Sequence, residues 1–312
     1  MSEHPVNITA SIQARLANEA RKTGKPFSEV FQYYGMERFL YRLFLTSYKD
    51  SFILKGGLIF YSQGIPLRRL TRDIDFLGLL ENQKEIITRV ITDSLSISAP
   101  EDGMNFDLAS LEVEDTQVDA DRNGIHANFV GYLGKSKIPI QIDFGFSDEI
   151  TSEPDKINFP TILTGMTGSQ IMGYPIESVV AEKLHAMERF AAIPSRWKDY
   201  YDIWLISENY EIDDRSLQKA ISKTFEIRVT TVPSGRPISL TVDFATKYRE
   251  NWITFMKRSD LGMTEINDLL VLVEKIWVFL EWPLQGIITP NSHRDNRRWI
   301  PAERKWKKLG GL

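Results

Sequence analysis

Apolar residues recur at helical spacing at the start of the chain. Ile8, Ile12 and Leu16 share one face of a helix that begins after Asn7 and ends at Gly24. Asn suits the N-cap and Gly the left-handed position after a helix. A second apolar series follows Pro26 with the same spacing: Val30, Phe31, Tyr34, Phe39, Leu40, Leu43 and Phe44. We therefore expect residues 1–50 to form an N-terminal helical cover.

The pattern then changes to one typical of strands. The apolar run 52–54, the pair Gly56-Gly57 and the apolar residues 58–61 predict a strand, a glycine turn and a short helix. Residues 73–77 alternate acidic and apolar side chains, as a half-buried strand does. Further along, the chain predicts an amphipathic helix over 82–96 and antiparallel strands within 105–118, 124–133 and 138–146.

Helical spacing returns after Pro175. Helices are predicted over 176–190, 196–207, 216–225, 240–256 and 264–282. Because the preceding stretch, 152–175, is rich in Gly, Ser and Pro, we divide the remaining chain into an α/β core, 51–165, and a C-terminal helical domain, 166–312. The predicted fold class is α+β, with a mixed sheet and flanking helices followed by the helical domain.

Composition restricts the chemistry of the protein. The 312 residues are 42% hydrophobic and 26% charged, which is ordinary for a globular protein, and include no cysteine. Thiol chemistry is excluded, and a metal ion would need oxygen ligands or some of the four histidines. The most apolar stretch, 269–282, contains three charged residues, and the N-terminus lacks an apolar signal segment. We therefore expect a cytoplasmic protein with no membrane partner.

Three carboxylates are predicted to meet on one face of the sheet. Asp73 and Asp75 are two residues apart on a strand, so both side chains point to the same side. In the strand 138–146, Ile and Phe occupy the apolar face, which leaves Asp143 on the polar face. If the two strands are neighbours, three like charges converge and need cations to offset their repulsion.

Such an all-oxygen cluster suits Mg²⁺ or Mn²⁺, which bind carboxylates together with substrate phosphates. Two metal ions there can promote attack by an oxygen and stabilise the leaving pyrophosphate. A glycine turn after a strand lets the backbone approach a triphosphate. A lone Asp-x-Asp is usually a solvated strand end, and a lone Gly-Gly pair is usually a bend. Here the glycine pair comes first, the Asp-x-Asp follows and a third carboxylate lies on a later strand. This combination favours an enzyme that transfers a group from a nucleoside triphosphate.

The glycine turn followed by Thr71-Arg72-Asp73-Ile74-Asp75 resembles the signature of DNA polymerase β-type nucleotidyltransferases. In particular, it is similar to the AbiEii toxin group, which includes the MenT-type toxins of bacterial toxin–antitoxin systems. Residues 181–186 and 198–203 resemble a second signature of this group. The resemblance implies a polymerase β-type fold, nucleotidyl transfer and a cognate antitoxin. Because MenT-type relatives modify the 3′ end of tRNA, it also implies an RNA acceptor, with tRNA as the example.

The resemblance implies roles for residues of the first motif. Asp73 and Asp75 match the metal-binding pair, and Gly56 and Gly57 match the turn that holds the triphosphate. Many members of the superfamily have Gly-Ser at this turn, so the chain lacks a hydroxyl there. We add Lys55, beside the turn, and Arg72, beside the carboxylates, as candidate nucleotide-binding residues.

The second motif has several interpretations. The resemblance matches Lys183 to a lysine that contacts phosphate, and either Asp199 or Asp202 to an acidic residue of the group. From the residues alone, Lys183 follows an apolar stripe, which is typical of a surface lysine. The two Asp residues share a helix face and can orient Lys183 or Arg189, bind a metal or act as a base. They can equally form surface ion pairs with Arg196 or Lys198. His185, the histidine nearest a motif, is more typical of a structural residue.

Basic residues gather in two places although the net charge is −4. Arg68, Arg69 and Arg72 adjoin the carboxylates, where they can meet a triphosphate or RNA. The segment 294–308 contains seven basic residues interleaved with Trp299 and Trp306. This segment is either a stacking contact for RNA or a solvated tail whose tryptophans pack on the helical domain.

The leading hypothesis is a metal-dependent nucleotidyltransferase toxin that transfers a nucleoside monophosphate to an acceptor. One alternative is a protein of the same fold that sequesters GTP or RNA without transfer. Another is a phosphotransferase that uses the γ-phosphate of the nucleotide.

Overall fold

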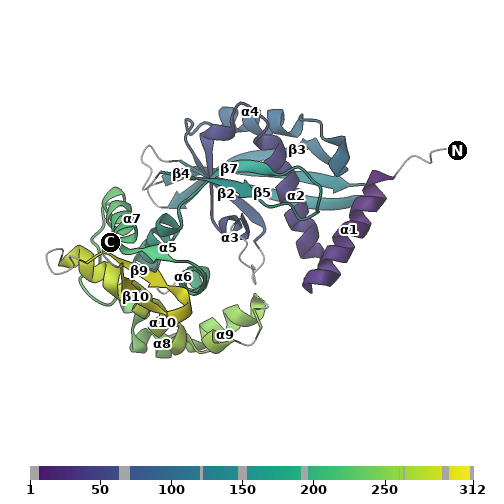
Figure 1. The fold of residues 1–312 in the computed structure, drawn as a ribbon. Helices are drawn as coiled ribbons and strands as arrows, with labels where there is room; N and C mark the ends of the chain where they lie inside the picture. Colours follow the sequence, from purple (N-terminus) through teal and green to yellow (C-terminus); the bar gives the residue numbers. More distant parts are fainter. Residues whose placement is uncertain are drawn as a thin grey trace. The chain divides into compact units, whose positions relative to one another are not determined.

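The computed structural model describes residues 7–62, 71–119, 122–146, 153–190, 196–259, 261–262, 264–289 and 295–309. The chain divides into two compact units (Figure 1). The first comprises Met1–Asp148 and Pro154–Tyr174, and the second comprises Glu149–Glu153 and Pro175–Leu312.

A mixed seven-stranded sheet forms the centre of the first unit. Its strands are β1 (Phe52–Lys55), β2 (Asp73–Gly78), β3 (Met104–Asp119), β4 (Arg122–Leu133), β5 (Ser136–Phe146), β6 (Asp155–Phe159) and β7 (Ser169–Gly173). Their order is β3-β4-β5-β2-β1-β7-β6, with β2 parallel to β5, β1 parallel to β7, and the other neighbours antiparallel. The strands β1 to β5 were predicted, whereas β6 and β7 lie in the stretch expected to be a linker. They are strands because β7 pairs with β1, which lies far from it in sequence.

Four helices of the first unit follow the predicted positions: α1 (Ile8–Thr23), α2 (Phe27–Leu43), α3 (Leu58–Ser62) and α4 (Lys84–Leu95). Asn7 caps α1 by accepting a hydrogen bond from the N–H of Ala10, and Gly24 ends it with φ 69°. The helix α2 packs on β5, and a Cβ at Gly35 would lie 2.8 Å from Cγ2 of Ile138. The glycine that weakens the helix locally therefore permits its close approach to the sheet.

One face of the sheet is apolar and the other polar. In β5, Ile138, Ile140, Ile142 and Phe144 are buried, and they alternate with more exposed positions. The helices α2 and α4 pack on one side of the sheet and against each other (Figure 1). The alternation thus separates a core-facing side from a side that carries the acidic residues of β2 and β5.

A buried ion pair ties α2 to the start of β3. Arg42 donates from Nη1 to Oδ2 of Asp102 at 2.5 Å and from Nη2 to Oδ1 at 3.1 Å. The same guanidinium donates to the carbonyl of Met104. Both side chains are almost fully buried, so the paired geometry and the extra hydrogen bond offset the desolvation of the two charges.

The second unit is mainly helical. Its helices are α5 (Ile176–Phe190), α6 (Trp197–Asn209), α7 (Asp214–Ile227), α8 (Val242–Lys247), α9 (Arg249–Arg258) and α10 (Leu269–Ile288). The helix predicted over 240–256 is instead the pair α8 and α9, separated at Tyr248. The last helix begins later than predicted, because Asp268 caps its first turn. None of the described helices combines the length and the apolar character needed to cross a membrane.

A small antiparallel sheet in the second unit was not predicted. It contains β8 (Ile212–Asp213), β9 (Arg297–Ile300) and β10 (Lys305–Lys308), in the order β10-β9-β8. The pairing of β9 with β8 joins segments distant in sequence. The predicted C-terminal helical domain therefore includes a sheet built from what looked like a basic tail.

The turn between β1 and α3 depends on a glycine. Gly56 has φ 68°, in the left-handed region where residues other than glycine are strained. A Cβ at this position would lie 1.8 Å from Oδ2 and 2.8 Å from Cβ of Asp75. Because even the Cβ of Asp75 is too close, rotation of that side chain does not relieve the clash.

We expect Gly56→Ala to destabilise the protein by roughly 2–4 kcal/mol, because strain and a clash add together. Gly24→Ala is the matched control, since Gly24 has φ 69° but a Cβ added there would meet no atom within 4 Å. It should cost only about 1 kcal/mol. Urea unfolding followed by far-UV circular dichroism measures both values, and equal losses would contradict the role assigned to Asp75.

Candidate active site

Three carboxylates converge on the polar face of the first unit's sheet. The parallel strands β2 and β5 are neighbours, with Asp75 opposite Asp143 and Asp73 opposite Gln141. One carboxylate oxygen from each of Asp73, Asp75 and Asp143 lies within 4.8 Å of the others, and all three residues are half-buried. The strand adjacency on which the predicted cluster depends is therefore present in the fold.

The donor set fits divalent metal ions. Carboxylate oxygens are the ligands that Mg²⁺ and Mn²⁺ prefer. At an effective dielectric constant of about 20, each pair of these charges repels by roughly 3 kcal/mol at this separation, which bound cations would offset.

Lys55 lies beside this acidic cluster. It ends β1 and is paired in register with Asp75 on β2. Its Nζ lies 3.3 Å from the position that a Cβ would take at Gly145 on β5. Because Gly145 has no side chain, the ammonium group can lie over the strand that carries Asp143. The fold thus places a positive charge next to the predicted metal ligands.

A buried hydroxyl lies against the glycine turn. A Cβ at Gly57 would lie 2.3 Å from Oγ1 of Thr71, a residue only 2% exposed. The N–H of Thr71 donates to the hydroxyl of Tyr33, but Oγ1 of Thr71 has no hydrogen-bond partner among the described residues. The turn itself lacks a hydroxyl because glycine occupies position 57. In the fold, Thr71 brings a hydroxyl to the space beside Gly57 from another segment.

The predicted basic loop is only partly described. Arg72 is exposed and directly precedes the carboxylates of β2. Arg68 and Arg69 lie outside the described residues. Their expected contact with a triphosphate or RNA stays a prediction.

His126 is a site residue that was not singled out from the sequence. It lies on β4 opposite Asp143, and its Nδ1 is 2.6 Å from Oδ1 of that residue. Its Nε2 is 3.1 Å from Oδ1 of Asn128. The alternation in the predicted strand 124–133 contained a signal, because it places His126 and Asn128 on the polar face. By contrast, His185 is buried and packs edge-on against Phe225, as expected for a structural histidine.

The predicted residues of the second motif come together within the second unit. Nζ of Lys183 on α5 lies 2.7 Å from Oδ2 of Asp202 and 3.2 Å from Oδ1 of Asp199, both on α6. The side chain of Lys183 is only 14% exposed, and those of its two partners are exposed even less, so Lys183 is not a solvated surface lysine. Arg196 approaches Asp199 at 3.4 Å, whereas Lys198 is exposed to solvent. The structure shows both Asp residues paired with Lys183 and also the pair between Asp199 and Arg196 from the alternative interpretation, whereas metal binding or a role as a base stays a prediction.

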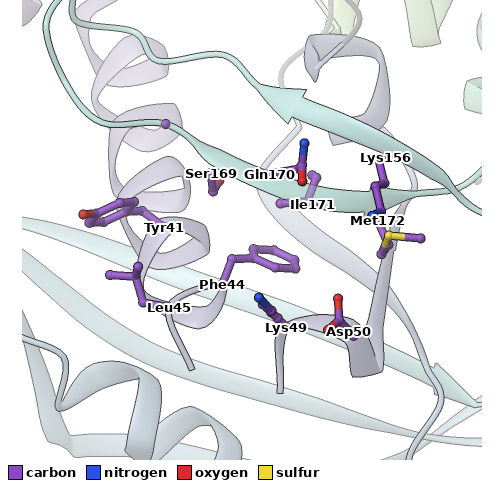
Figure 2. A pocket seen from close by; sticks show the side chains of 11 residues that line it. Tyr41, Phe44, Leu45, Lys49, Asp50, Lys156, Ser169, Gln170, Ile171 and Met172 are labelled. Atoms are coloured by element: carbon purple, nitrogen blue, oxygen red, sulfur yellow. The ribbon is translucent and has the colours of Figure 1, made fainter. Parts of the chain in front are cut away.

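A separate hollow in the first unit lies near the start of β1. It has a volume of about 340 Å³, and Figure 2 shows Lys49 and Asp50 facing residues of β6, β7 and the end of α2 around it. The glycine turn follows the other end of β1. None of the predicted site residues lines this hollow.

The tryptophans of the C-terminal segment are packing residues. Trp299 is 2% exposed and donates from Nε1 to the carbonyl of Ser207. Trp306 stacks on Phe279 with centroids 5.9 Å apart and donates to that residue's carbonyl. Trp299 is therefore too buried to stack on RNA, and both rings pack on the helical domain as the alternative expected, although Trp306 stays partly exposed.

The cations of the same segment are already engaged by the protein. Arg297 lies 3.5 Å from the ring centroid of Trp282, and each other described basic residue of the segment contacts a carboxylate. Hydrogen bonds from Lys305 and Lys307 hold the pKa of Glu303 below its usual value. A hydrogen bond from Lys275, together with Arg304, does the same for the pKa of Glu265. The excess of positive charge in this sequence is thus offset by acidic residues around it.

Comparisons with known proteins find one family model and two solved structures that are similar to this chain. The family model "Nucleotidyl transferase AbiEii toxin, Type IV TA system" matches residues 38–276. The fold is similar to two crystal structures from Helicobacter pylori. One, JHP933, has a TM-score of 0.49 and 14% identity, covering 83% of this chain and 95% of that chain. The other, described as a candidate nucleotidyltransferase, has a TM-score of 0.43 and 15% identity, covering 81% and 93%. No curated protein matches the chain.

The family match extends over more than half of the chain. It includes the glycine turn, the three carboxylates and the largely covered Lys183 with its two Asp partners. The chain therefore belongs to the AbiEii family of nucleotidyl transferase toxins of type IV toxin–antitoxin systems.

Proposed function

We propose that this nucleotidyltransferase toxin transfers a nucleoside monophosphate from a nucleoside triphosphate to an RNA acceptor, with tRNA as the first candidate. The observation that carries the proposal is the cluster of Asp73, Asp75 and Asp143 oxygens within 4.8 Å of one another. Membership of a type IV toxin–antitoxin family supports a cognate antitoxin as its partner. The RNA acceptor follows from the resemblance to MenT-type toxins.

In the proposed reaction, an acceptor oxygen attacks the α-phosphorus while the bond to the bridging oxygen breaks and pyrophosphate leaves. Mg²⁺ or Mn²⁺, when bound, stabilises negative charge on the attacking and leaving oxygens. Asp73, Asp75 and Asp143 would hold the metal. At Gly56 and Gly57 the missing side chains make space for Asp75 and Thr71, which pack against the turn, and the bare backbone would bind the triphosphate through its N–H groups. Such a reaction needs positioning and charge stabilisation more than a dedicated base.

The double variant Asp73→Ala/Asp75→Ala should lose transfer by at least ~10³-fold, because it removes two of the three metal ligands. Each α-labelled nucleoside triphosphate is incubated with Mg²⁺, total RNA and the protein, and the products are separated on a gel. Asp115→Ala, an exposed carboxylate on β3 outside the cluster, is the matched control.

The same assay separates the alternatives. Label transferred from γ-labelled but not α-labelled nucleotide would indicate a phosphotransferase. Nucleotide binding with growth inhibition but no labelled product would indicate sequestration. Either result would contradict nucleotidyl transfer to RNA.

Thr71→Val tests whether the buried hydroxyl serves the triphosphate. Valine has nearly the same shape, and the hydroxyl has no partner among the described residues, so stability should be unchanged or higher. The KM for the nucleotide should rise about 10-fold, since one hydrogen bond to a charged group is worth roughly 1.5 kcal/mol. An unchanged KM with intact stability would show that Thr71 only packs against Gly57.

Lys183→Met should reduce transfer at least ~10-fold if the lysine contacts phosphate. It should also destabilise the second unit by roughly 3 kcal/mol, because the buried carboxylates of Asp199 and Asp202 lose the ammonium group of Lys183. The chain's tryptophans all follow residue 175, so their fluorescence during urea unfolding reports on this unit. In Lys183→Met/Asp202→Asn, stability should recover in part while transfer stays low. Recovery of transfer would assign Lys183 a structural role alone.

A further inference from the structure

Four polar residues form a continuous row across the sheet of the first unit. Lys55 pairs with Asp75, Asp75 with Asp143, and Asp143 with His126, on the strands β1, β2, β5 and β4 in turn, and beyond His126 the row continues to the exposed Glu114 on β3. Residues paired in register on neighbouring strands project to the same face. The two carboxylates are therefore flanked by Lys55 on one side and by His126 on the other.

From this row we propose that His126, supported by Asn128, is a positioning residue that fixes the metal-binding carboxylate of Asp143. The proposal rests on the proposed metal-dependent function. It adds to that function a residue outside the Gly-Gly turn and the Asp-x-Asp motif.

The contact between His126 and Asp143 is short and direct. Nδ1 of the imidazole lies 2.6 Å from Oδ1 of Asp143, within the range of a strong hydrogen bond. An ionised carboxylate only accepts hydrogen bonds, so Nδ1–H is the donor. This bond engages one oxygen of Asp143 and restricts rotation of the carboxylate plane.

Asn128 holds the other side of the imidazole. It lies two residues along β4, on the same face, and its Oδ1 is 3.1 Å from Nε2 of His126. With Nδ1–H as the donor to Asp143, Nε2 is the acceptor in the matching tautomer, so the bond to Asn128 forms with the amide turned to present Nδ2 in place of Oδ1. With both ring nitrogens engaged in this way, the imidazole has one preferred orientation. Asn128 thus supports the hydrogen bond that His126 donates to Asp143.

Asp143 needs such support because its surroundings do not fix it. Its side chain is 42% exposed, so packing leaves the carboxylate free to rotate. Repulsion from Asp73 and Asp75 favours rotation away from the cluster. A hydrogen bond that already holds the carboxylate in place reduces the conformational entropy that is lost when the metal binds. Residues that orient metal ligands in this way typically change metal affinity by about 10–100-fold when they are replaced.

The test measures Mn²⁺ affinity without nucleotide, by the electron paramagnetic resonance signal of free Mn²⁺ in a titration of the full chain. His126→Leu should weaken Mn²⁺ binding about 10-fold. His126→Asn, nearly the same size as Leu, keeps an amide donor close to the position of Nδ1 and should stay within about 3-fold of wild type. Tyr132→Phe, on the same face of β4, is the control and should bind as wild type does.

Asn128→Ala provides a second variant in case His126→Leu is poorly folded. It removes the anchor of the imidazole and should weaken Mn²⁺ binding about 3-fold, with a circular dichroism spectrum like that of wild type. The inference is overturned if folded His126→Leu binds Mn²⁺ within twofold of wild type. It is also overturned if His126→Asn is as weak as His126→Leu, since then the donor is not what matters.

Failure of the inference and failure of the proposed function give different results. If wild type binds Mn²⁺ no better than Asp73→Ala/Asp75→Ala, the metal site itself is absent and both proposals fail. If that double variant loses binding while His126→Leu and Asn128→Ala keep it, only the role of His126 is wrong.

Discussion

The repulsion among Asp73, Asp75 and Asp143 is the constraint on which the candidate site depends. Their oxygens lie within 4.8 Å of one another because β2 and β5 are parallel neighbours in the sheet. Three like charges at this separation repel one another, and cations or hydrogen-bond donors nearby offset that repulsion. Lys55 and His126, on either side of Asp75 and Asp143 in the same cross-strand row, are placed to do so, and metal ions would complete the balance.

The second unit balances its buried carboxylates differently. Asp199 and Asp202 are almost fully buried, and Lys183 lies between them with Arg196 at the edge. Here the compensating charge belongs to the protein, and the group is held by two packed helices, α5 and α6. In the first unit the carboxylates stay half-exposed. Exposed carboxylates whose negative charge is only partly neutralised by the protein are suited to bind exchangeable cations. Buried carboxylates that are neutralised by protein cations are suited to hold side chains in one fixed geometry.

In this protein, a cluster of basic residues in the sequence does not correspond to an unpaired basic surface in the fold. The segment 294–308 has the composition of an RNA contact, yet its tryptophans are packed and its described cations have partners within the protein. Exposed ion pairs are individually weak. Together with the buried rings, however, they make this segment an integral edge of the second unit rather than a tail.

The sequence alone determined much of this protein. Period and capping predicted the helices α1, α2 and α4 and the strands β1 to β5, because these signals act within a few residues. Alternation placed Asp143 on the polar face, and the glycine pair with Asp73 and Asp75 indicated the chemistry. Only the tertiary structure decided which strands are neighbours, since pairing joins residues far apart in sequence. That pairing brings Asp143 beside Asp75, His126 beside Asp143 and Thr71 beside Gly57. It also makes strands of β7 and β9, whose sequences carry no strong strand signal, because their partners supply the hydrogen bonds that local propensity does not specify.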